Sequence, residues 1–307
     1  MGRRGLRVAA GAYMALIFFF LYFPIGVLVV FSFNASRINA TWQGFTLDWY
    51  RQLFHDFAIW AATSNSLIVG VASAAISTVI GTMAAFALHR YSFRGKAAFE
   101  SLLQLPIVIP EIVMGVSLLA FFVLIEMPLG LHTVTIAHVA FNISFVTVVV
   151  RARLYAFDFT LEEAAMDLGA NRWQTFFKVT LPLIAPGVAA GFLIALTLSL
   201  DDFIIAFFTA GPGANTLPMQ VYSMMRFGVT PKVNALSTLM LAVVILIGVV
   251  GQFIFRGRKE TPVPEEEIHP VPRGFEVYAK AGSDRARVPV GAVGARSSPD
   301  AQHLQLG

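Results

Sequence analysis

The chain has 307 residues, of which 57% are hydrophobic and 13% are charged, and its mean hydropathy is +0.71. Soluble domains carry about 25% charged residues, so these values exclude an ordinary water-soluble enzyme. The net charge of +4 comes from basic residues beside apolar runs, which indicates membrane orientation and not nucleic-acid binding. Because cysteine is absent, disulfides, thiolate metal sites and cysteine nucleophiles are excluded as well.

Six stretches of the chain have the length of about 20 mostly apolar residues that a transmembrane helix needs. They cover residues 8–33, 63–88, 100–125, 133–152, 183–209 and 235–255. Three arginines precede the first stretch, as in a signal peptide. However, its apolar run of about 25 residues is longer than a signal core, and no A-x-A cleavage site follows. We therefore expect it to be retained as a membrane helix.

The flanking charges predict the orientation, because lysines and arginines near membrane helices favour the cytoplasm. Thirteen of them lie in residues 1–7, in the second and fourth connections and just after the sixth stretch. The outer connections 34–62 and 210–234 together carry only four. Both termini are therefore expected to be cytoplasmic.

The sequence divides into three parts. Residues 1–7 form a cytoplasmic N-terminus, residues 8–256 form the helical membrane domain, and residues 257–307 form a proline-rich tail with equal numbers of acidic and basic residues. The tail cannot bury enough apolar surface to fold, so we predict a disordered cytoplasmic segment. The second apolar stretch is rich in glycine, alanine and serine, which predicts close packing inside a bundle or at a subunit interface.

The connection between the fourth and fifth stretches has the pattern of a surface helix. Thr160 followed by Glu162 and Glu163 predicts a helix start, with a hydroxyl cap and with acids at the positive end of the helix dipole. Apolar residues then recur every three or four positions up to Gly169, which suits the left-handed residue that ends a helix. With a second short helix expected at 172–179, the connection forms a helix–turn–helix able to dock into a groove on a soluble partner.

This connection, residues 160–182, also carries a recognisable motif. It contains Glu163-Ala164-Ala165, then Gly169, then Val179-Thr180-Leu181-Pro182. It resembles the "EAA" loop of the permease subunits of ABC importers, and only Val179, which replaces isoleucine, departs from that pattern. The resemblance implies an all-α membrane protein with six transmembrane helices, the fold of a type I ABC importer permease, and a cytoplasmic coupling helix.

In that family the short helix couples ATP hydrolysis on a cytoplasmic ATPase to opening of the membrane path. The resemblance therefore implies that Glu163, Ala164, Ala165 and Gly169 contact the ATPase. The chain itself shows no nucleotide site, because the Gly95-Lys96 pair is followed by Ala97 and lacks the spacing of a P-loop. We expect a transporter subunit and not an enzyme, with no catalytic residues, no metal and no cofactor of its own, and with ATP and Mg²⁺ bound by the partner.

Three acids lie within the apolar stretches: Glu111 in the third, and Asp201 and Asp202 in the fifth. A buried aspartate costs about 2.5–3.5 kcal/mol at the centre of a membrane helix. No lysine or arginine lies in any span interior, so the acids imply a cationic occupant: a metal ion, protons or an organic amine. Pro106 and Pro110 precede Glu111 and predict a kinked segment that lines a cavity.

Adjacent residues on a helix point about 100° apart. We therefore expect at most one of Asp201 and Asp202 to point down the path, while the other reaches a neighbouring helix. The stagger in depth between Glu111 and Asp201 suits an elongated multi-amine better than a compact ion. His138 and Asn142, one turn apart in the fourth stretch, are expected to bond within the bundle.

A second resemblance covers about residues 10–256. It rests on Ser32-Phe33-Asn34, Trp42-Gln43-Gly44-Phe45-Thr46, Tyr91-Ser92-Phe93-Arg94-Gly95-Lys96, Leu198-Ser199-Leu200-Asp201-Asp202 and Asn234-Ala235-Leu236. These segments look like those of the second permease of spermidine/putrescine importers. In that family the acids at the positions of Glu111 and Asp201 face the substrate path, and the first is often aspartate.

This resemblance implies a polyamine importer in the bacterial inner membrane that works by alternating access. Its partners would be a second permease, an ATPase dimer and an extracytoplasmic solute-binding protein, with no nucleic acid. An alternative keeps the architecture and changes the cargo to ferric iron, thiamine or an aminophosphonate. An intramembrane aspartyl protease needs carboxylates from separate elements, whereas Asp201 and Asp202 are neighbours. A passive cation channel leaves the EAA loop unexplained.

Overall fold

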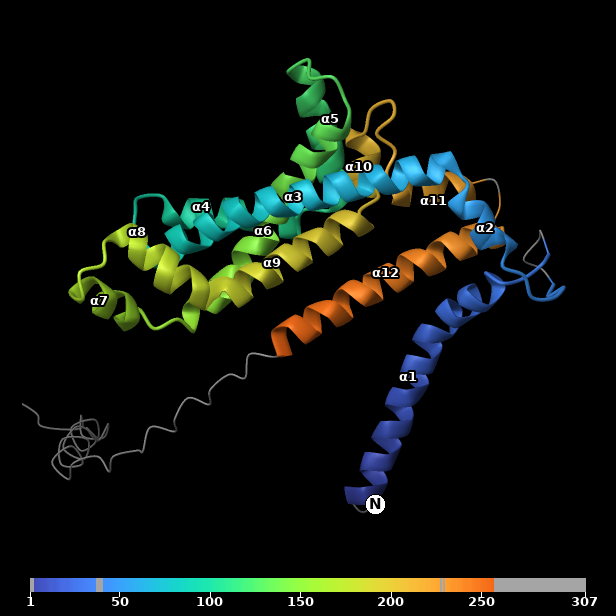
Figure 1. The fold of residues 1–307 in the computed structure, drawn as a ribbon, viewed down its shortest axis with the longest axis horizontal. Coiled ribbons are helices and arrows are strands. Elements are labelled where there is room, and N and C mark those ends of the chain that lie inside the picture. The colour runs from blue at the N-terminus through green and yellow to red at the C-terminus, as the bar shows by residue number, and fades with distance from the viewer. Residues whose placement is uncertain (1–2, 37–40, 227, 229, 257–307) are drawn as a thin grey trace, which may run out of the picture. The chain divides into compact units, whose positions relative to one another are not determined.

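The computed structural model describes residues 3–36, 41–226, 228 and 230–256. All the elements named in this part of the chain are helices, and one isolated antiparallel bridge joins Asn34 to Phe45. The all-α class predicted from the sequence is therefore confirmed (Figure 1). The expected disorder of the tail, residues 257–307, lies outside the described residues.

Among the described residues, five helices are long and apolar enough to cross a membrane, and a bent pair can supply a sixth crossing. The five crossings contain α1 (Arg3–Phe31), α3 (Phe57–Arg90), α6 (Leu131–Tyr155), α9 (Leu181–Asp201) and α12 (Pro231–Arg256). The bent pair is α4 (Lys96–Val108) with α5 (Glu111–Leu124). The short helices are α2 (Asp48–Phe54), α7 (Thr160–Asp167), α8 (Arg172–Thr175), α10 (Ile204–Thr209) and α11 (Leu217–Met225). Helices thus cover all six predicted stretches.

The helices α3, α6 and α9 pack against one another and form the main core (Figure 1). The small residues of α3 allow this close approach. A Cβ atom at Gly81 would lie only 2.8 Å from Cβ of Val146, and one at Gly187 of α9 would lie 2.6 Å from Cβ of Arg153. The expectation that the second stretch packs closely inside the bundle is confirmed, because 14 residues of α3 are buried, among them Ser66, Gly70, Ser73, Ala74, Ser77, Gly81 and Ala85.

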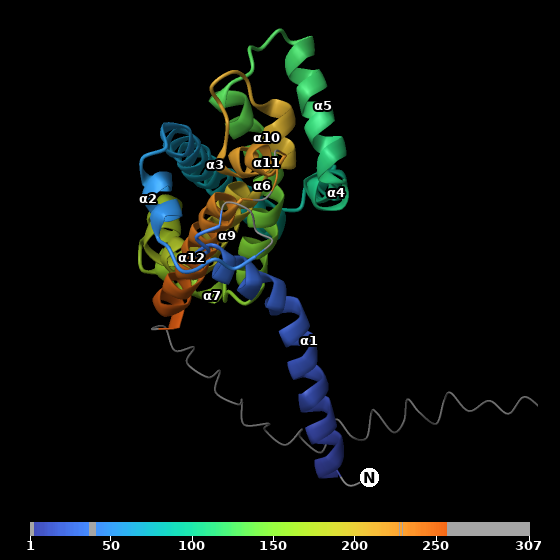
Figure 2. The ribbon, with the colours of Figure 1, turned by 90° about the vertical axis from the view of Figure 1, so that its right-hand side faces the viewer.

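The third stretch differs from the single kinked helix that the sequence predicted. It is broken between α4 and α5, whose axes differ by 111° (Figure 2). The break lies at Ile109 and Pro110, which have extended backbone, while Pro106 is accommodated inside α4. Pro110 lacks the amide hydrogen that a continuing helix would use. As a result, Glu111 is the first residue of a new helix and does not lie within a continuous one.

The fifth stretch is also broken, which corrects the expectation of one helix over 183–209. The helix α9 ends at Asp201, Asp202 is extended with φ −66° and ψ 125°, and α10 begins at Ile204. The argument that two adjacent acids diverge by about 100° on one helix therefore does not apply. The two carboxylates diverge because the backbone changes conformation between them.

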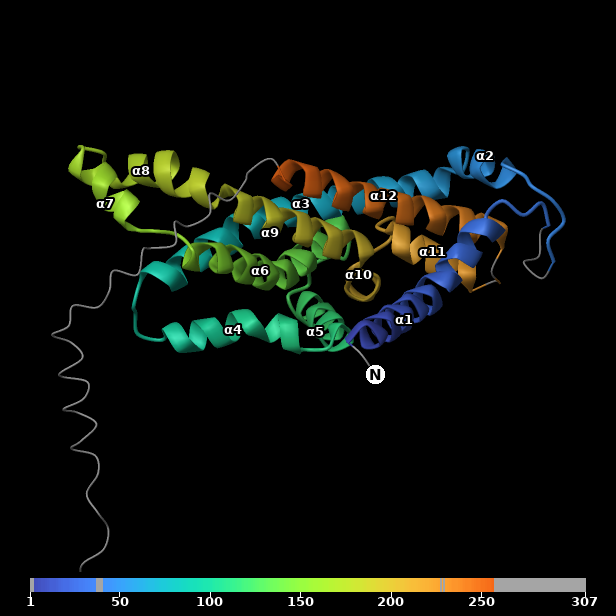
Figure 3. The ribbon, with the colours of Figure 1, turned by 90° about the horizontal axis from the view of Figure 1, so that it is seen from below.

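Short helices lie at both ends of the bundle. The helices α7 and α8 lie at one end, whereas α2 and α11 lie at the other (Figures 1 and 3). No residue in the apolar window of α1 is buried by the rest of the described chain. That helix is therefore available to lipid or to another subunit.

Candidate functional site

The helix α7 carries the motif that the sequence singled out. Its start is capped by Asp158, whose Oδ1 accepts a hydrogen bond of 2.9 Å from the Thr160 amide. The prediction that the Thr160 hydroxyl caps the helix was therefore wrong, because the cap is the Asp158 carboxylate, two residues earlier. The hydrogen bond to Thr160 holds the pKa of Asp158 below its ordinary value. Gly169 follows the helix at φ +92°, so the prediction of a left-handed terminal residue is confirmed.

The motif residues lie mainly on the surface. Glu163, Ala164 and Gly169 are exposed, and Ala165 is half-buried. The apolar side of α7 is equally uncovered, because Leu161 is 47% exposed and Leu168 is 91% exposed. An uncovered apolar helix face offers a contact surface for another protein.

Glu162, next to the motif, behaves differently. Its side chain is almost fully buried, pairs with Arg90 at the end of α3, and accepts a hydrogen bond of 2.5 Å from the Thr180 hydroxyl. Arg90 also lies over the Phe159 ring, 5.4 Å from its centroid. Glu162 therefore ties α7 to the end of α3 and to the segment that leads into α9.

That segment does not form the separate helix expected at 172–179. The helix α8 continues through a π-helical turn, η1 (Phe176–Thr180), directly into α9. Asn171 and Gln174 cap its start reciprocally, since each side chain accepts the other's amide at 2.9–3.0 Å. A cavity of about 920 Å³ lies between α3, α7 and this segment, with Arg90 and Glu162 in its wall. The continuous helix connects the motif mechanically to the fifth span.

The two helix breaks bring together acids that are far apart in the sequence. Glu111 begins α5, Asp201 ends α9, and both are exposed. Glu111 lies one turn before Gly115, which packs against Ile204 and Ile205, just beyond Asp201 in the chain. The helices α5 and α10 pack closely because Gly115 leaves room for Phe208, whose Cδ2 would lie 2.9 Å from a Cβ there. Neither the Glu111 carboxylate nor the Asp201 carboxylate has a hydrogen bond or ion pair to another described residue.

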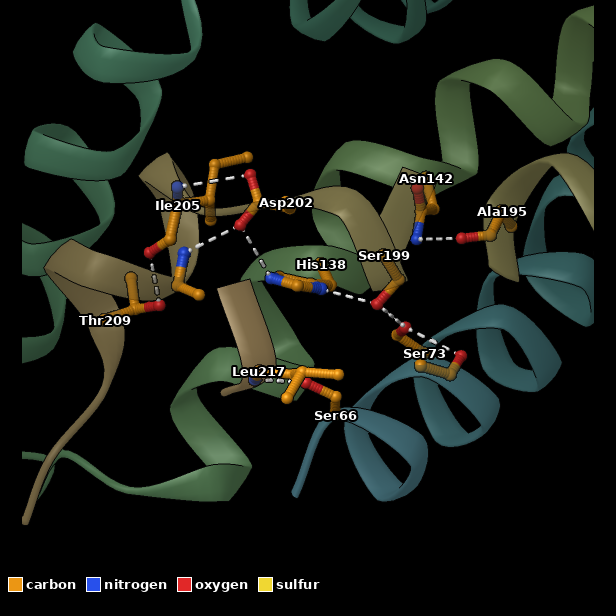
Figure 4. A network of polar contacts seen from close by, with 12 residues as sticks. Ser66, Ser73, His138, Asn142, Ala195, Ser199, Asp202, Ile205, Thr209 and Leu217 are labelled. Carbon is orange, nitrogen blue, oxygen red and sulfur yellow. Dashed lines mark hydrogen bonds and ion pairs between the residues drawn. The ribbon is translucent and has the colours of Figure 1, made fainter. Parts of the chain in front are cut away.

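The Asp202 carboxylate, in contrast, is buried and has several partners (Figure 4). Its side chain is 6% exposed, and its two oxygens accept the amides of Ile205 at 3.3 Å and Ala206 at 2.8 Å. The second oxygen also lies 3.1 Å from Nε2 of His138 on α6. Of the two aspartates, Asp201 thus has the exposed carboxylate. The assignment of all three acids to the substrate path stays a prediction.

The expectation that His138 and Asn142 bond within the bundle is confirmed. His138 forms a hydrogen bond with Ser199 and lies 3.1 Å from Asp202, and Asn142 donates a hydrogen bond of 3.3 Å to the Ala195 carbonyl (Figure 4).

The motif on α7 and the packed helices behind it are matched by known proteins. Residues 77–257 match the sequence profile of the family described as "binding-protein-dependent transport system inner membrane component". The chain belongs to this family. The permease is 41% identical over 252 residues to the spermidine/putrescine transport system permease protein PotC of Escherichia coli (strain K12), covering 82% of this chain and 96% of that protein. It is 42% identical over 244 residues to the putrescine transport system permease protein PotI of the same strain. This match covers 77% of this chain and 87% of that protein.

The fold of the permease is shared with solved importers. A bacterial ABC transporter involved in the import of the acidic polysaccharide alginate matches 83% of this chain and 99% of its own, with a TM-score of 0.65 and 18% sequence identity. The type I ABC importer fold expected from the EAA loop is therefore confirmed, and the permease is a multi-pass membrane protein.

Two side chains of the permease were missed by sequence reasoning in the roles they have here. Glu162 looked like a helix-start acid, and its partner Arg90 is 72 residues away. His138 was expected to bond within the bundle, but nothing in the sequence indicated that its ring contacts both Ser199 within α9 and Asp202 at the break. The sequence offered one signal for the first contact. An acid, Glu162, lies beside the motif, and a basic residue, Arg90, ends the second span, so the two could pair.

Proposed function

We propose that this permease subunit imports putrescine or spermidine across the bacterial inner membrane, with Glu111 and Asp201 in the substrate path. The observation that carries the proposal is that these two exposed carboxylates, neither of which has a basic partner among the described residues, lie at the breaks of two spans that pack together. A site with an excess of negative charge stabilises a positively charged amine. The likeness to PotC and PotI, whose names give polyamines as cargo, supports the same substrate class.

The importer needs other subunits. The exposed face of α7, with Glu163, Ala164, Ala165 and Gly169, is suited to docking one subunit of an ATPase dimer that binds ATP and Mg²⁺. A second permease completes the path, and a solute-binding protein delivers the amine from outside. The breaks in the third and fifth spans are the points at which the path can alternate between outward and inward access. Both termini then lie in the cytoplasm.

The test is uptake by the whole transporter in proteoliposomes, with permeases, ATPases and binding protein present. Asp201→Asn and Glu111→Gln should each raise the KM for putrescine about tenfold, because each removes a charge-assisted hydrogen bond. Glu126→Gln is the matched control, since Glu126 is an exposed acid just beyond the other end of α5. An unchanged KM in both variants, or preferred uptake of ferric iron, thiamine or an aminophosphonate, would overturn the proposal.

A further inference from the structure

A buried histidine joins the two sides of the break in the fifth span. The His138 side chain is 2% exposed and comes from α6, in the core of the bundle. Its Nδ1 lies 2.6 Å from the Ser199 hydroxyl, within α9, and its Nε2 lies 3.1 Å from the Asp202 carboxylate, just beyond α9 (Figure 4). One rigid ring thus contacts the helix before the break and the residue at the break.

The chemistry of the partners assigns the direction of these bonds. The Asp202 carboxylate has no hydrogen to donate, so a hydrogen in this contact can come only from Nε2 of His138, although the contact lacks hydrogen-bond geometry. In the neutral ring, Nδ1 then accepts from the Ser199 hydroxyl. Ser73 of α3 donates in turn to Ser199, at 3.0 Å. The chain of contacts therefore runs from α3 through α9 and α6 to the break.

Asp202 passes this restraint on to the next helix. Its two oxygens accept the amides of Ile205 and Ala206, at the start of α10. Those amides have no partner within a helix, so the carboxylate satisfies them and fixes where α10 begins. His138 of α6 contacts the same carboxylate. The contacts of Asp202 therefore relate the start of α10 to α6.

Asp201 is the residue that this arrangement presents. It is the last residue of α9, it is exposed, and it precedes Asp202 directly in the chain. We propose that His138 is a positioning residue for Asp201: by contacting Ser199 and Asp202 at once, it fixes the break so that the Asp201 carboxylate stays exposed at the end of α9. This inference rests on the proposed role of Asp201 in the path.

Two substitutions separate the bonds of the imidazole. The amide nitrogen of glutamine reaches the place of Nε2, so His138→Gln keeps a donor for Asp202. The shorter amide of asparagine reaches only the place of Nδ1, so His138→Asn keeps a contact to Ser199 and loses Asp202. Asn142→Leu is the matched control, because it removes another buried polar contact one turn along α6 without touching the break.

The measurement is binding-protein-dependent putrescine uptake by the complete transporter in proteoliposomes. His138→Asn should raise the KM about tenfold through displacement of Asp201, with the maximal rate and ATPase association nearly unchanged. His138→Gln and Asn142→Leu should each stay within about twofold of the unmodified KM. Added to Asp201→Asn, His138→Asn should cause no further rise, since the charge that it positions is already gone.

The double variant separates this inference from the proposed function. If Asp201→Asn leaves the KM unchanged, the proposed role of Asp201 fails and the inference fails with it. If Asp201→Asn raises the KM but His138→Asn has no effect, or has one that adds fully to it, only the inference is overturned. Should His138→Asn not assemble, Asp202→Asn takes its place. Asparagine keeps an oxygen for the amides of α10 but removes the carboxylate that faces Nε2, and a KM rise that disappears in the Asp201→Asn background is again required.

Discussion

Asp56 joins the starts of α3 and α12. Its Oδ1 accepts the amides of Ala58 at 2.9 Å and Ile59 at 3.4 Å, which caps α3, and its Oδ2 lies 2.6 Å from the Lys232 ammonium on α12. The hydrogen bond from Lys232 holds the pKa of Asp56 below its ordinary value of 3.8, against the opposing effect of burial. The carboxylate is thus both a helix cap and one half of a bridge between two spans.

The charge and the cap can be separated by Asp56→Asn, since asparagine caps helices as well as aspartate does. The folded pKa lies below the unfolded one, so the charge stabilises the fold above about pH 4 and this contribution is lost as the pH falls through the folded pKa. At pH 7 the variant should be less stable by up to about 1 kcal/mol, as expected for a partly exposed pair. Thermal unfolding in detergent should show this difference shrinking in acid, and a difference that persists there would contradict the assignment.

Glu162 and Glu163 are neighbours with opposite surroundings, which gives a matched pair of substitutions. Glu162→Gln should lower the stability of the permease by about 1–3 kcal/mol, because it breaks the bond to Arg90 and leaves buried polar groups poorly satisfied. Glu163→Gln should leave stability unchanged and weaken ATPase association instead. Unfolding and co-purification of the ATPase with each variant check this, and equal effects of the two changes would contradict it.

At the scale of the elements, the positions of the six crossings were predictable because length and hydropathy alone define them. The breaks were not. Pro106 and Pro110 indicated a kink, yet only Pro110 lies at the break, since nothing local tells which proline a helix will accommodate. At the break after Asp201, Asp202 lies against His138, more than 60 positions earlier in the chain. Long-range contacts of this kind leave no periodic signal in a single sequence.

The α3–α6 crossing should be sensitive to a single methyl group. A Cβ at Gly81 would meet Val146 at 2.8 Å and the Ile143 carbonyl at 3.1 Å, so Gly81→Ala should destabilise the permease by about 1–3 kcal/mol through overpacking. Gly248→Ala on α12 is the control, because a Cβ there has open space around it and alanine favours helix. The two variants are compared by thermal unfolding of the purified transporter. Equal stability of the two would show that α3 and α6 can move apart.

At the scale of the whole molecule, two contacts place the ends of α3. Ser66, early in α3, accepts the amide of Leu217 at the start of α11 at 2.7 Å, and Arg90, at the end of α3, pairs with Glu162 of α7. The part of α3 from Ser66 to Arg90 covers about 36 Å, enough to cross the hydrocarbon core of a bilayer. We therefore expect α7 and α11 to lie at opposite membrane faces. The basic residues then predict which face is which, since Arg94 and Lys96 lie beside the α7 end.

This orientation can be tested directly, because the chain has no cysteine that would need to be removed first. Ser92 lies exposed in the connection after α3, and Ser223 lies exposed on α11, so each can be replaced by the nearly isosteric cysteine. In intact spheroplasts an impermeant maleimide should label Ser223→Cys and spare Ser92→Cys, which should react only after the membrane is permeabilised. The reverse pattern would place the ATPase-docking face outside the cell, where no ATP is available, and would overturn both the orientation and the coupling role of α7.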